Sequence, residues 1–191
     1  MKKGLLFALT LVTALGASAQ FVKLEVETIK NGELPGDTYR LYAVMQNAND
    51  LVDAVYGDQN NPMKIESSTS FYQNENGGPF SSDVLRSSLE NDQNMAYDSW
   101  VTIGVEDNYG NALTGFLIDM SAFEEGDAIL TTDGAWFVTP DKRQAYAGEN
   151  KKVLLMQLTS DGLVNGVINL HGRTAGNEEW KMESVKFSMG K

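Results

Sequence analysis

The chain has 191 residues, a formal net charge of −11 and no cysteine. Such an acidic chain repels phosphate backbones and anionic lipid, so we expect neither a nucleic-acid partner nor polybasic docking on a membrane. The lack of cysteine excludes thiol catalysis, disulfides and a lipid-anchored cysteine, so stability must come from burial, partner contacts or bound ions. The length suits one domain with a sizeable core.

Residues 1–19 have the features of a secretory signal peptide. Two lysines precede the apolar run 4–15, and the small residues 17–19 (ASA) supply a signal-peptidase site before Gln20. The run is shorter than the roughly 20 residues of a membrane span, which favours cleavage over a retained N-terminal anchor. We expect residues 20–191 to form one domain that is secreted or held at the cell surface, with the periplasm as a further option. No membrane span is expected after cleavage.

Most of the remaining chain alternates between apolar and polar residues with a period of two, which is typical of β-strands. The predicted strands are 21–29, 38–45, 51–57, 63–69, 99–105, 115–120, 128–132, 135–139, 152–159, 163–170 and 180–189. Turn-forming Gly, Asn and Asp separate them, and all four prolines lie in these connections. The near-continuous apolar run in 152–159 predicts a central strand buried on both faces. We expect an all-β antiparallel β-sandwich, with a jelly roll as one candidate topology.

One segment, 81–95, breaks this period. Val84, Leu85 and Leu89 follow a helical spacing there, and nearby Ser and Asp residues can cap a helix start. We predict one short helix or helical loop. It is the longest interruption between strands, so we expect it to cover an end of the sandwich.

The strand around Trp100 raises the question of ligand binding. It places Trp100 on the same face as Asp98 and Thr102. In one interpretation the aromatic rings are exposed, with Trp100, Asp98 and Tyr72 as candidate ligand-binding residues, because β-sandwich modules can stack such rings on sugars. In the other, Trp100 packs under a loop such as 81–95, and Asp98 is held by backbone N–H groups or a hydroxyl. We favour the packed arrangement, because tryptophan is highly buried on average.

Calcium is the one candidate cofactor. Two turns, EDNYGN (106–111) and YGDQNNP (56–62), gather carboxylate and amide oxygens, and calcium binds six to eight oxygens. Asp107 and Asp58 are the candidate ligands. Neither turn has the order of an EF-hand loop, and Asp and Asn also form turns without any ion. We favour the turn-forming role.

His171 is the only histidine. It could act as a general base or metal ligand, but a catalytic histidine needs an orienting partner, so we favour an exposed strand residue. One histidine without cysteine does not make the usual structural zinc site. Residues 20–191 contain no G-x-S-x-G, H-E-x-x-H or phosphate-binding glycine loop, and we assign no catalytic residue. A glycosidase needs only two carboxylates, whose separation across a cleft cannot be derived from strand spacing.

Six motifs stand out along residues 20–191: TYRLYA (38–43), FYQN (71–74), YDSWVTIG (97–104), DGAWFVTP (133–140), VLLMQLT (153–159) and INLHGR (168–173). Together they resemble a domain, with no established activity, that is found in secreted proteins of marine bacteria. The resemblance spans most of residues 20–191. It implies secretion and a shared fold, and it carries over no catalytic or binding residue.

Three functions remain open from the sequence. The first is a secreted non-catalytic β-sandwich module for adhesion, assembly or interaction with a matrix or surface, whose partner is an extracellular glycan or protein surface. The second is a carbohydrate-binding module with surface aromatics and a structural calcium ion. The third is a glycan-acting hydrolase with an unlocated pair of carboxylates. The sequence does not define an oligomeric state.

Overall fold

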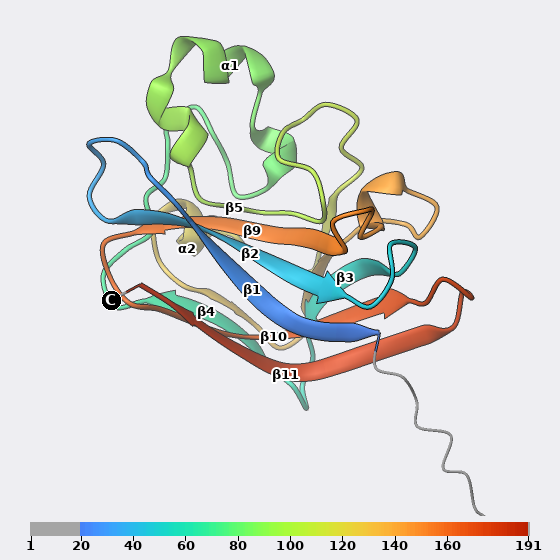
Figure 1. Ribbon diagram of the computed structural model, residues 1–191. Helices are drawn as coiled ribbons and strands as arrows, with labels where there is room; N and C mark the ends of the chain where they lie inside the picture. The colour runs from blue at the N-terminus through green and yellow to red at the C-terminus, as the bar shows by residue number, and fades with distance from the viewer. Residues whose placement is uncertain (1–19, 191) are drawn as a thin grey trace, which may run out of the picture.

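The computed structural model describes residues 20–190, which form two antiparallel β-sheets packed face to face (Figure 1). The predicted all-β sandwich is therefore confirmed. The predicted signal peptide, residues 1–19, lies outside the described residues. Within residues 20–190, no helix is long and apolar enough to cross a membrane.

Short helices interrupt a succession of strands along the chain. The strands are β1 (Phe21–Ile29), β2 (Asp37–Met45), β3 (Leu51–Gly57), β4 (Met63–Ser67), β5 (Trp100–Val101), β6 (Thr114–Phe116), β7 (Ile129–Thr131), β8 (Gly134–Phe137), β9 (Lys152–Ser160), β10 (Val164–Arg173) and β11 (Glu179–Met189). The helices are α1 (Arg86–Asn91) and α2 (Ser121–Glu124), with 3₁₀ turns at Ser81–Asp83, Gln93–Tyr97 and Arg143–Ala145. Each predicted strand has a counterpart, and the predicted helical segment contains α1.

The first sheet has the strand order β1-β2-β9-β5. β9 lies in its interior, and every residue of β9 after Lys152 is buried. The core covers one face of this strand and the chain around α1 covers the other. The apolar run of β9 had predicted this double burial.

The second sheet is built around β10, which pairs with β11 along one edge and with β3 and β4 along the other. β3 and β4 therefore lie end to end, with β8 and β7 beyond them and β6 at the far edge. The buried Asn169 holds the join between β3 and β4, because its Nδ2 donates to the carbonyls of Tyr56 and Asn61 at 2.8 and 2.7 Å. A buried amide needs such partners, so Asn169 serves the framework of the sheet.

One main core fills the space between the sheets. Trp136 of β8 is fully buried in it, and its Nε1 donates to the carbonyl of Thr102 at 3.0 Å. This bond satisfies the only polar group of the indole. Other core side chains come from both sheets: Leu41, Met45, Ile65, Val101, Met156, Ile168 and Leu170.

Residues 81–97, here called the covering segment, lie over the outer face of the first sheet (Figure 1). A second hydrophobic cluster joins this segment to the sheet, and it comprises Val84, Met95, Trp100 and Leu154, with Tyr42 and Leu89 packed against it. The predicted packing of Trp100 under this loop is confirmed. The strand is shorter than the predicted 99–105, because regular pairing ends at Val101 and the chain turns at Gly104, whose φ is +77°.

Candidate functional site

Among residues 20–190, no helix lies over β10 and β11 on the outer face of the second sheet, here called the open face (Figure 1). Its side chains alternate along the strands with the core residues Val55 and Trp136. The ladder register aligns them in two rows: Thr114, Phe137, Ala54, His171 and Lys181, and then Phe116, Ala135, Tyr56 and Asn169. Phe116 is 59% exposed. The open face therefore presents aromatic and cationic side chains together.

His171 on this face has a carboxylate partner. Its Nδ1 lies 2.5 Å from Oδ1 of Asp53, a residue of β3 that is almost fully buried. The register between β10 and β3 shifts between His171 and Gly172, and this irregularity leaves Asp53 beside the imidazole. The expectation of an exposed, unpartnered histidine is therefore wrong: His171 is half-buried and oriented.

Arg173 extends this ionic group. Its Nε lies 3.9 Å from Oδ2 of Asp53, and its guanidinium pairs with Glu179 at 2.7 Å. A row of contacts thus runs from Glu179 through Arg173 and Asp53 to His171. The first three charges in this row alternate in sign. In the neutral tautomer that carries its proton on Nδ1, facing Asp53, Nε2 is an acceptor for a ligand. Within residues 20–190, Asp53 is the only residue hydrogen-bonded to the imidazole, so no serine or threonine hydroxyl contacts it.

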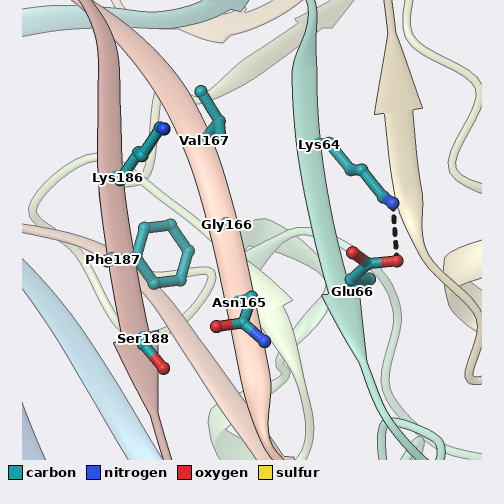
Figure 2. Close-up of a pocket in the computed structure, with 8 residues that line it drawn as sticks. All are labelled: Lys64, Glu66, Asn165, Gly166, Val167, Lys186, Phe187 and Ser188. Carbon is teal, nitrogen blue, oxygen red and sulfur yellow. Dashed lines mark ion pairs between the residues drawn. The ribbon is translucent and has the colours of Figure 1, made fainter.

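A groove of about 440 Å³ crosses the opposite end of the open face (Figure 2). The residues lining it are Lys64, Glu66, Asn165, Gly166, Val167, Lys186, Phe187 and Ser188. Lys64 and Glu66 form an ion pair at 2.7 Å on β4, while Lys186 lies on β11 across the groove. A side chain at position 166 would collide with Phe187, because its Cβ would lie 2.2 Å from Cζ of that ring. Glycine at position 166 therefore makes room for the Phe187 ring to pack against β10.

Tyr72, one of the predicted ligand-binding residues, lies in a different cleft of about 480 Å³. The cleft is also lined by Pro35, Ser70, Phe71, Gln73, Glu124, Glu125, Ser160 and Asp161. The Tyr72 hydroxyl accepts from Nδ2 of Asn74 at 3.3 Å, and desolvation by burial raises the pKa of this phenol. Tyr72 is therefore a neutral, half-buried ring beside several carboxylates.

Trp100 and Asp98, the other two predicted ligand-binding residues, are buried. Trp100 is only 2% exposed, so it offers no ring face on which a sugar could stack. Oδ1 of Asp98 accepts from the backbone N–H groups of Asn74 and Ser99 at 2.8 and 3.0 Å, as the packed interpretation predicted. Its Oδ2 is buried without a hydrogen-bond partner, and burial raises the pKa of Asp98 to about 6. Asn74 links Asp98 to Tyr72, but Trp100 lies in the separate cluster under the covering segment.

The two candidate calcium ligands hold their own turns. Oδ1 of Asp58 accepts from the N–H groups of Asn60 and Asn61, both at 2.8 Å. In Asp107, Oδ1 accepts from the Tyr109 N–H at 2.8 Å, and Oδ2 pairs with Arg86 at 2.6 Å. Among the described residues, no group of three or more His, Cys, Asp or Glu could hold a metal ion.

Comparison with protein-family models, with curated proteins and with solved structures finds no match to this chain. The assignment of the candidate site therefore rests on the geometry of its residues. Sequence reasoning missed Asp53, although a lone carboxylate inside the apolar strand LVDAVYG was a usable signal. A charge in such a strand is kept only with a partner, and His171 and Arg173 were candidate partners.

Proposed function

We propose that this protein is a non-catalytic binding module which acts outside the cytoplasm and attaches to an extracellular glycan or protein surface through its open face. The observation that carries this proposal is the contrast between the outer faces of the sheets: the covering segment packs over β5 and β9 on the first, while the second presents aligned aromatic and ionic side chains. Exposed apolar groups on a sheet face that nothing covers favour a partner for that face.

The chemistry of the open face supports attachment. Phe116 supplies an exposed ring, and aromatic rings contribute strongly to protein and sugar contacts. His171 is held by Asp53, so it can meet a ligand donor without first losing side-chain freedom. The groove between Lys64 and Lys186 adds a hollow for a projecting group.

A binding role also agrees with the surroundings of His171. Asp53 orients it as a general base would be oriented, yet no hydroxyl nucleophile among the described residues touches the ring. The pair is therefore suited to recognition by hydrogen bonds. A hydrolase that uses two carboxylates is the remaining enzymatic alternative.

The test is a binding screen of the purified protein on glycan arrays and on extracellular matrix preparations. We expect Phe116→Ala to weaken binding about tenfold, because that corresponds to the roughly 1.4 kcal/mol of one moderate aromatic contact. Tyr109→Ala is the matched control, since Tyr109 is 71% exposed but stacks on Arg86 beside the covering segment. Equal losses in both variants would contradict the assignment to the open face.

A second candidate function is carbohydrate binding in the Tyr72 cleft. A half-buried ring beside Gln73, Glu124 and Asp161 is the observation that favours it, because sugars combine apolar faces with hydroxyl donors. On the same array, this candidate predicts that Tyr72→Ala abolishes binding and that Phe116→Ala does not. The same array is repeated with calcium and with a chelator, which tests whether binding in the cleft requires an ion.

Export is tested separately. If residues 1–19 are a cleaved signal, the mass of the protein released by cells should correspond to a chain that begins at Gln20. A membrane-held species, or a released protein that keeps Met1, would contradict this part of the proposal.

A further inference from the structure

β1 is an edge strand with one side unused. It pairs with β2 in regular register from Lys23 to Ile29, and no other strand in residues 20–190 pairs with it. The long edge strand of the second sheet, β11, is less regular, because its register shifts and Ser184 has a φ of +53°. The backbone groups of a regular edge can extend a sheet with a strand from another molecule.

The side chains of β1 differ between its two faces. Leu24 and Val26 oppose Ala43 and Leu41 of β2, so they lie on the core side. Because the strand is at an edge, Val26 remains 37% exposed. The other face carries Lys23, Glu25 and Glu27, and within one copy Glu25 pairs with Lys23 at 2.9 Å and also with Lys152. Charge pairs between copies would therefore add to these pairs.

We propose that a second copy of this chain pairs antiparallel with β1, with Leu24 opposite Leu24 on a two-fold axis. In this register Lys23 of each copy faces Glu25 of the other, so two opposite-charge pairs form at once. Leu24 meets its own counterpart, and Val26 lies near Val22, which is also exposed. The first sheets of the two copies then become continuous, with their core sides facing the same way.

Other pairing registers between the β1 strands of two copies are less favourable electrostatically. Centring the pairing on Glu25 sets Lys23 opposite Glu27 but also sets Glu25 opposite itself, and centring it on Val26 sets Glu25 opposite Glu27. Like charges directly opposite each other are unfavourable, and here they would add to the repulsion between two acidic molecules. A shift by an odd number of residues would place Leu24 opposite a charged residue and reverse the faces of the second copy. Of these registers, the one centred on Leu24 forms opposite-charge pairs without placing like charges opposite each other.

This association goes beyond the proposed function and uses a different surface. The open face belongs to the second sheet, whereas β1 is the edge of the first. Loss of association would therefore leave binding by single molecules intact, and loss of glycan or matrix binding would leave association intact.

The experiment is a dilution series of the purified protein in sedimentation or light scattering, with the N-terminus established by intact mass. Lys23→Glu should weaken association about tenfold or more, because it turns two attractive pairs into repulsive ones. The swap Lys23→Glu/Glu25→Lys should restore association in part, because the exchanged lysine then lies beside Lys152 of its own copy. Lys30→Glu is the matched control, since it makes the same charge change one residue beyond β1. Circular dichroism verifies that each variant folds.

A second measurement does not depend on charge. The chain has no cysteine, so a single introduced thiol can form a disulfide only between copies. Leu24→Cys should cross-link on mild oxidation, because the two positions meet on the axis, while Thr28→Cys should not. A wild-type protein that stays monomeric at the highest attainable concentration would overturn the proposal. So would equal weakening by Lys23→Glu and Lys30→Glu, or equal cross-linking at positions 24 and 28.

Discussion

The two outer faces of the sandwich place similar residues in opposite environments. On the first sheet, the covering segment buries Trp100 in an apolar cluster and leaves Asp98 fully buried nearby. On the second sheet, Phe116 is exposed, and the nearly buried Asp53 contacts His171 and Arg173. An aromatic ring and a carboxylate close in sequence or space therefore do not indicate a binding face by themselves. Such a pair is accessible to a ligand only where no other segment of the chain covers it.

The two buried carboxylates make the difference clearer. Asp98 is held only by backbone N–H groups and has one unpartnered oxygen, so desolvation dominates and its pKa rises. Asp53 has cationic or polarisable partners on both oxygens. On the covered face one oxygen of the buried carboxylate therefore has no partner, whereas on the open face both oxygens of Asp53 lie beside the side chains of His171 and Arg173.

The largest expected effect separates the two aromatic residues. Trp100→Ala should lower the free energy of unfolding by about 3–5 kcal/mol, as large-to-small changes in a packed cluster do. Phe116→Ala should lower it by less than about 1 kcal/mol, because its ring is mostly in water. Denaturant unfolding of both variants measures the contrast. A small loss for Trp100→Ala would mean that the covering segment opens readily and that the ring is available to ligands after all.

The second prediction concerns pH. The folded state of the protein binds the Asp98 proton more tightly than the unfolded state, because the pKa rises from 3.8 to about 6 on folding. The free energy of unfolding of the wild type should therefore fall, relative to Asp98→Asn, as pH rises from about 3 to about 7, by roughly 3 kcal/mol in total. Denaturant melts of both proteins across this range measure the difference. Parallel curves would show that Asp98 does not titrate in this window.

The third prediction tests the ionic group of the open face. Asp53→Asn removes the charge that faces Arg173 and the imidazole, and it should lower the free energy of unfolding by about 1–3 kcal/mol. Glu179→Gln removes the other carboxylate from the same Arg173, but this pair is exposed and should contribute less than about 1 kcal/mol. If both variants lose the same amount, the Asp53 group does not stabilise the open face.

Much of the fold could be predicted from the sequence, because strands with one buried face alternate and turns need Gly, Asn and Asp. The helical spacing in 81–95 even predicted the cover over Trp100. The order of strands could not be predicted, because β3 and β4 join end to end through Asn169, whose amide bonds across the loop. The Asp53–His171 contact could not be predicted for a related reason. It depends on a register shift between β10 and β3, and such irregularities leave no periodic signal.

The smallest expected effect is that of calcium on the two acidic turns. A calcium site that exists only in the folded state would raise the melting temperature, by the equivalent of about 2.7 kcal/mol at a hundredfold excess over its Kd. We expect the same melt in calcium and in chelator, because Asp58 already accepts two backbone N–H groups and Asp107 already pairs with Arg86. Asp107→Asn keeps an oxygen for the Tyr109 N–H and should change stability by less than about 1 kcal/mol in either buffer. A calcium-dependent rise that this variant abolishes would instead make the turn beside the covering segment an ion site, and the covered face would then be held by a metal as well as by Trp100.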